Sequence, residues 1–101
     1  MSFLNHNQIE DYNNKGYVSP INIFSKQEAK EIREEIEKIE KKWPEALTGL
    51  NRNYVHLISP VFDKICHNSK ILDAVEGLIG KNILICGTTL FIKNPNEKGF
   101  V

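Results

Sequence analysis

The sequence has few cysteines, no excess of charge of either sign and no long apolar run, and each lack excludes a class of protein. Cys66 and Cys86 lie far apart and form no CxxC pair, which argues against a disulfide scaffold or a zinc knuckle. Thirteen basic residues balance thirteen acidic ones, so the chain lacks the basic excess expected of a protein that binds nucleic-acid phosphates. No apolar run approaches the roughly 18 residues that a membrane span needs.

The start of the chain also lacks the basic and apolar stretches of a signal peptide, because it opens on acidic and amide residues. We therefore expect a cytoplasmic protein with no membrane and no nucleic-acid partner. The P-loop, GxGxxG, GxSxG, HExxH and zinc-ligand spacings are all missing. What is present is 101 residues with 41% hydrophobic and 26% charged side chains, a mix typical of one small globular domain.

Capping signals and apolar spacing predict four helices. The clearest covers 26–42, where Ser25 and Glu28 form a capping box. Apolar residues follow there at spacings of three and four, which places one stripe along the helix: Ala29, Ile32, Ile36, Ile39 and Trp43. Three further helices are expected at 6–14, 60–66 and 70–79, and a polar loop is expected at 45–54.

Two other stretches are predicted to be strands. Residues 17–24 favour β-structure, although Pro20 restricts them to a short or edge strand. Residues 83–93 are apolar on both alternating faces, which is typical of a strand covered on both sides. The expected helices can cover one of those faces, and nothing else in the chain obviously covers the other. This mismatch suggests the opening section of a larger β-structure.

Histidine and cysteine residues are the remaining candidates for chemistry. No histidine begins the H-x-D or H-x-E pair that commonly supplies two ligands of an iron site. His6 is expected to be solvated, and His67 to make a capping or surface hydrogen bond. His56 follows a polar cluster and either makes structural hydrogen bonds or helps to line a pocket with Asn51, Asn53 and Tyr54. Cys66 is expected in a helix core and Cys86 in a strand core.

The order of these elements resembles the amino-terminal portion of the phytanoyl-CoA dioxygenase family. NSKILDAVEGLIGKNILI at 68–85 is similar to a helix, its closing glycine and the first core strand of that family. TLFIKNP at 89–95 is similar to the strand end that leads to the iron site. NYVHL at 53–57 resembles the preceding segment, most like the branch of halogenases and small-molecule hydroxylases, and residues 4–29 resemble the family's opening. The resemblance extends over essentially the whole chain and rests on the order of patterns.

The resemblance implies an α+β fold, made of the N-terminal helices and first strands of a double-stranded β-helix, or jelly roll. Residues 1–101 are then the N-terminal portion of a single domain. The implied enzyme uses Fe(II), 2-oxoglutarate and O2 to hydroxylate or halogenate a small organic substrate. In the family the first iron ligands lie in an H-x-D, or in halogenases an H-x-A or H-x-G, which this chain does not reach. The 101 residues alone are therefore predicted to have no catalytic residue, to bind neither iron nor 2-oxoglutarate, and to be inactive.

Three residues carry a weaker implication of the same resemblance. Leu90 matches a strand position whose side chain packs near 2-oxoglutarate in the family. Tyr54 and His56 match a segment that lines the cofactor or substrate pocket, although the family often has a Lys at the place of Tyr54. Leu90, His56 and Tyr54 are therefore the predicted cofactor-binding residues.

A second hypothesis belongs to a different class of protein. The apolar stripe of 26–42 would bind a partner, and the chain would be a non-catalytic helical interaction module. This hypothesis predicts a chain that folds cooperatively by itself. The dioxygenase hypothesis instead predicts a poorly folded chain, because one apolar face of 83–93 would lack cover.

Overall fold

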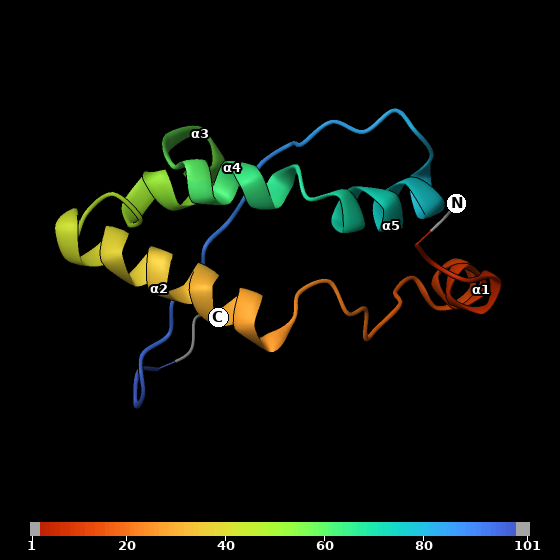
Figure 1. Ribbon diagram of the computed structural model, residues 1–101, viewed down its shortest axis with the longest axis horizontal. Coiled ribbons are helices and arrows are strands. Elements are labelled where there is room, and N and C mark those ends of the chain that lie inside the picture. The colour runs from red at the N-terminus through yellow and green to blue at the C-terminus, as the bar shows by residue number, and fades with distance from the viewer. Residues whose placement is uncertain (1–2, 99–101) are drawn as a thin grey trace.

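The computed structural model describes residues 3–98, and the regular structure in that range is helical (Figure 1). No strand forms between residues 3 and 98. The expected α+β fold with the first strands of a jelly roll is therefore wrong for the described chain. Its elements, in order, are α1 (His6–Lys15), α2 (Lys26–Lys42), η1 (Gly49–Asn53, a 3-10 helix), α3 (Val55–Ile58), α4 (Pro60–Cys66) and α5 (Ser69–Ile79).

The helices with sequence capping signals form where they are predicted. Both α2 and α4 have the predicted bounds, and α1 and α5 are each one residue longer. In the capping box of α2, the Glu28 N–H donates to Ser25 Oγ at 3.1 Å and the Ser25 N–H donates to Glu28 Oε1 at 3.4 Å. The side chain of Asn68 accepts from two N–H groups in the first turn of α5, those of Lys70 and Ile71. Local capping thus fixes these boundaries.

A 3-10 helix, η1, forms within the predicted polar loop at 45–54, and the short helix α3 follows directly after that loop. Neither η1 nor α3 has a side-chain cap. Instead, α3 buries Val55, which is 2% exposed. Tertiary packing rather than a local signal holds this part of the chain in a helical conformation, so its sequence reads as a loop.

Residues 17–24 are not the predicted edge strand, and link α1 to α2 as an extended chain (Figure 1). A strand requires a neighbour to complete its ladder of hydrogen bonds. A side chain contacts this stretch instead, since Lys70 Nζ donates to the carbonyl of Ile23 at 3.4 Å. Tyr17 remains 63% exposed.

Residues 83–93 are not the predicted buried strand either. They run as irregular chain from the end of α5 behind α4 and α2 (Figure 1). Leu84 is 92% exposed and Phe91 is 68% exposed, so the apolar faces are not covered as the pattern indicated. Cys86 is exposed, which corrects its predicted core position, whereas Cys66 in α4 is partly buried. Without a partner strand in the described residues, the backbone has no ladder to join.

The main apolar cluster consists of Leu47, Val55 and Phe62. Partly buried side chains from three other places pack against it: Ile36 and Ile39 of α2, Ile65 of α4, and Leu90. A second contact lies at the other end of the molecule, where α1 meets α5 and where Leu4 and Ala74 are buried. Figure 1 shows α2, α3 and α4 gathered at one end and α1 beside α5 at the other.

The outer surface of α2 is dense with charge. Arg33 Nε lies 2.9 Å from Glu37 Oε1, and Lys38 Nζ lies 3.1 Å from Glu35 Oε1. Exposed pairs of this kind stabilise a helix by about 0.2–0.5 kcal/mol each. Across residues 3–98, neither α2 nor any other helix combines the length and the apolar character needed to cross a membrane.

Because the main cluster is small, removing one of its members should be costly. Leu47 is 3% exposed, and Leu47→Ala is expected to lower the free energy of unfolding by about 2–5 kcal/mol. Leu50→Ala removes the same atoms from a side chain that is 82% exposed, and should change stability by less than about 0.5 kcal/mol. Urea unfolding followed by circular dichroism measures both. Equal losses in the two variants would show that the Leu47 cluster is not the core.

Candidate functional site

The predicted site residues lie where two distant segments of the chain meet. Residues 52–56 lie against residues 88–90, and we call this contact the junction. His56 Nδ1 lies 2.9 Å from the Thr88 hydroxyl oxygen in a partly buried contact between residues 32 positions apart. A hydroxyl both donates and accepts, so this hydrogen bond forms with either imidazole tautomer. His56 therefore makes the structural hydrogen bond that the sequence left as one of two alternatives.

The end of η1 supplies the backbone part of the junction. The last carbonyls of a helix have no partner within it. Here the Leu90 N–H donates to the Arg52 carbonyl at 3.0 Å and the Thr88 N–H donates to the Asn53 carbonyl at 3.3 Å. The two donors are two residues apart, but the two acceptors are adjacent. In a pair of strands the acceptors, too, would be alternate residues. The junction therefore satisfies the end of η1 without forming a sheet.

Side chains complete the junction. Thr89 Oγ1 donates to Asn53 Oδ1 at 3.3 Å. The Leu90 side chain packs on the main apolar cluster. The guanidinium carbon of Arg52 lies 5.6 Å from the centre of the Phe91 ring, a cation–π contact. The junction thus combines two backbone hydrogen bonds with the side-chain contacts His56–Thr88 and Asn53–Thr89.

Of the three predicted site residues, the junction brings together the segments that carry His56 and Leu90, whereas Tyr54 takes part through its backbone alone. Tyr54 joins η1 to α3 through its backbone, and its N–H donates to the Asn51 carbonyl at 2.9 Å. Its side chain is 53% exposed. Tyr54 therefore lies at the rim of the junction rather than inside it.

Sequence reasoning missed two contributors, Arg52 and Thr88. Thr88 and Thr89 form a pair of hydroxyl residues inside an otherwise apolar stretch, which is the one signal that marks a polar contact there. Arg52 stands beside the polar cluster that was noted, but nothing in the sequence pairs it with Phe91. Contacts between segments so far apart depend on the fold and leave no local pattern.

The other histidines lie where solvent reaches them. His6 Nε2 lies 3.4 Å from Glu10 in an exposed pair on α1. His67 Nδ1 lies 2.9 Å from the Asp63 carbonyl oxygen, which is the predicted surface hydrogen bond. Among residues 3–98, no three His, Cys, Asp or Glu side chains gather where they could hold a metal ion. No catalytic step is assigned to these residues.

None of the protein-family models, curated proteins and solved structures compared with this chain matches it. The resemblance to the phytanoyl-CoA dioxygenase family accordingly stays a prediction from the sequence.

A polar turn follows the junction segment. The Glu97 carboxylate accepts from Asn94 Nδ2 at 2.8 Å and from the Asn94 N–H at 3.1 Å. The side-chain hydrogen bond from Asn94, with the backbone one second, holds the pKa of Glu97 below its ordinary value. The turn therefore favours the ionised carboxylate.

This lowered pKa gives the turn a pH dependence with a definite sign. The contribution of the ionised Glu97 is complete above the ordinary pKa of a glutamate and is lost as pH falls through the lowered value. Carboxyl chemical shifts, followed by NMR as a function of pH, should place the midpoint of Glu97 below the ordinary value of a glutamate. In Asn94→Ala the midpoint should return toward the ordinary value. An unchanged midpoint in that variant would contradict the assigned cause.

The hydrogen bond between His56 and Thr88 can be tested with a pair of isosteric variants. Thr88→Val removes a partly buried hydroxyl and should lower the free energy of unfolding by about 0.5–1.5 kcal/mol. Thr89→Val removes an exposed hydroxyl and should change stability by less than about 0.5 kcal/mol. Urea unfolding of both variants gives the comparison. A neutral Thr88→Val would show that this contact does not hold the junction.

Proposed function

We propose that this chain supplies part of the pocket wall of a cytoplasmic Fe(II)/2-oxoglutarate-dependent dioxygenase that hydroxylates or halogenates a small organic substrate. One observation carries the proposal: the junction joins the two segments to which the resemblance assigns the pocket. Those segments are more than thirty residues apart, and nothing local in the sequence requires them to meet. The proposal depends on this contact and not on strands in the described chain.

The junction suggests a distinct task for each residue. Leu90 presents apolar surface that keeps water away from a bound cofactor, and its own position is fixed by the main cluster. His56 orients the Thr88 hydroxyl through their hydrogen bond. The exposed Tyr54 ring lies at the rim, where it can contact a substrate. In such an enzyme the residues of this chain would orient ligands and exclude water, and bound iron would supply the chemistry of O2 activation.

The coding sequence beyond the Val101 codon offers the direct test. The proposal predicts an H-x-D, or in a halogenase an H-x-A or H-x-G, within about ten codons, which is the spacing that the resemblance implies. The protein encoded by the longer reading frame should form succinate from 2-oxoglutarate in the presence of Fe(II) and O2. A stop codon after Val101, or a longer product that forms no succinate, would contradict the proposal.

Variants of that longer protein test the role of the junction. His56→Ala should raise the KM for 2-oxoglutarate or for substrate by about 3–10-fold, as expected when a hydrogen bond worth about 0.5–1.5 kcal/mol is lost. Leu57→Ala is the matched control, because Leu57 is the next residue and is 72% exposed. Equal effects of the two substitutions would remove the junction from the pocket.

One observation favours the second function, a non-catalytic helical interaction module. Trp43 lies at the end of α2, and 54% of its surface is exposed although tryptophan is strongly apolar. The remainder of the predicted stripe is not equally free, since Ile36 and Ile39 pack on the main cluster. The surface for a partner is therefore not the stripe as predicted but the part of it near Trp43.

A further inference from the structure

An open groove runs between α2 and α4. It consists of two adjoining hollows of about 360 and 640 Å3, which share Glu35, Val61 and Lys64 in their walls. The smaller hollow extends toward the start of α2 and the larger one toward its end at Trp43. Each has room for more than one large apolar side chain.

The floor of the groove is apolar, and some of it is uncovered. Ile32 and Ile65 line the smaller hollow and are partly buried. Trp43 and Ile58 line the larger hollow and are 54% and 50% exposed. Exposed apolar side chains that are contiguous in this way mark binding surfaces on soluble proteins.

A buried hydroxyl in the larger hollow gives a second indication. Ser59 is 7% exposed and lines the wall, and its Oγ has no hydrogen-bond partner among residues 3–98. Leaving a buried hydroxyl unpaired costs free energy. A polar group on a bound segment would remove that cost.

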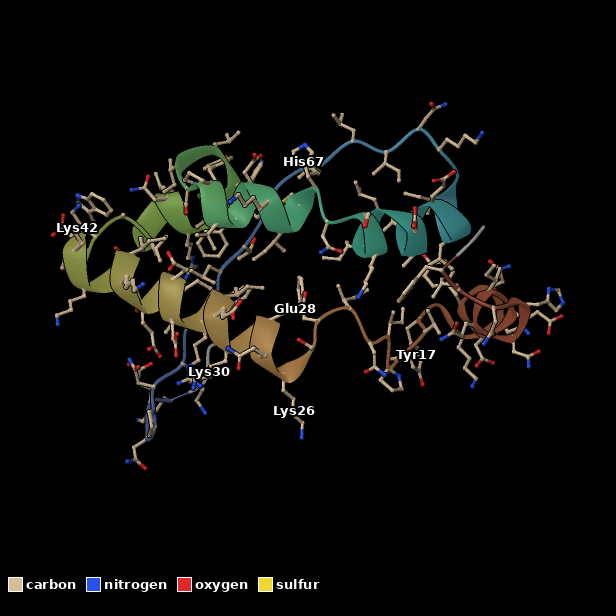
Figure 2. All side chains as sticks on the ribbon, viewed as in Figure 1. Tyr17, Lys26, Glu28, Lys30, Lys42 and His67 are labelled. Carbon is tan, nitrogen blue, oxygen red and sulfur yellow. The ribbon has the colours of Figure 1, made fainter. Side chains whose placement is uncertain are left out.

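The charge of the groove is unequal. Glu28, Glu31 and Glu35 of α2 line it, against the single ammonium of Lys64. Figure 2 shows Glu28 on the side of α2 that faces α4, whereas Lys26 and Lys30 point to the opposite side. Glu35 is paired with Lys38, and Glu31 accepts from Gln27 Nε2 at 3.0 Å, so among residues 3–98 Glu28 and Glu31 belong to no ion pair. A ligand that complements this wall carries positive charge.

We propose that the groove between α2 and α4 binds an amphipathic helix of a partner protein. That helix presents large apolar side chains at three- and four-residue spacings to the floor, and Lys or Arg to the carboxylates of α2. A helix is the fitting shape because both walls are helices, whose backbones offer no hydrogen bonds to an extended peptide. The inference is independent of the dioxygenase proposal, and it gives the interaction-module alternative a ligand of defined chemistry.

Trp43 is the one tryptophan of the chain and lines the groove, so its fluorescence reports occupancy directly. The probe is a synthetic helical peptide of about 16 residues without aromatic residues, with Leu at helical spacing and Lys along one flank. Its controls are a peptide with Glu in place of Lys and one of the same composition with the Leu order scrambled. The Lys peptide should shift Trp43 emission to shorter wavelength and bind about tenfold more tightly than the Glu peptide, as a few exposed ion pairs allow.

Two matched pairs of variants locate the binding. Glu28→Gln with Glu31→Gln keeps the capping box, since glutamine serves there too, and should reduce the tenfold preference to about twofold. Glu34→Gln with Glu37→Gln removes the same charge from carboxylates outside both hollows and should leave the preference unchanged. Ile58→Asn should abolish binding. Leu57→Asn, which changes an exposed side chain outside the groove, should not.

Three results would overturn the inference. The Lys and Glu peptides bind equally, the scrambled peptide binds as tightly as the Lys peptide, or the unsubstituted chain binds no peptide although circular dichroism shows its native helix content. Sedimentation of the chain tests a further outcome. A dimer that dissociates in Ile58→Asn would show that a second copy of the chain fills the groove. None of these outcomes bears on succinate formation, so failure here leaves the dioxygenase proposal to its own test.

Discussion

The contact among Leu47, Val55 and Phe62 is the constraint on which the rest of this end of the molecule depends. Val55 lies in α3, Phe62 in α4 and Leu47 in the turn between α2 and η1, and helices as short as α3 and α4 are not stable by themselves. Burying their side chains contributes about 1.5–3 kcal/mol each, against the cost of ordering the backbone between them. The cluster therefore holds α3 and the chain around it in one fixed arrangement.

The junction depends on this packing of α3 on the cluster. Val55 of the cluster follows η1 within two residues, and the Arg52 and Asn53 carbonyls at the end of η1 accept from the chain at 88–90. Leu90 contributes to both arrangements, since its side chain packs on the cluster and its N–H donates to Arg52. A pocket wall built in this way is positioned by core packing rather than by a sheet. The groove on α2 and α4 depends on the same cluster, because Ile36 and Ile39 of α2 attach to it.

The helices were predictable because their signals are local. Ser25 with Glu28, and Asn68 ahead of α5, mark boundaries through hydrogen bonds between near neighbours. The strand at 83–93 was predicted wrongly because an alternating apolar pattern shows only which partners a segment requires, not whether they are present. Its backbone meets the end of a 3-10 helix instead. The candidate site was predictable in part: the resemblance named His56 and Leu90, while their meeting through Thr88 and Arg52 depends on the fold.

Native-state hydrogen exchange of individual backbone amides measures most directly whether the junction holds residues 88–90 to the rest of the protein. The Leu90 and Thr88 N–H groups are bonded to η1, and we expect them to exchange slowly. Leu84 is 92% exposed, and its N–H should exchange close to the rate of an unfolded chain. Protection at 88 and 90 that is absent at 84 would support a core-anchored junction. Equally fast exchange at all three residues would contradict it, because residues 83–93 would then have no fixed attachment to the rest of the protein.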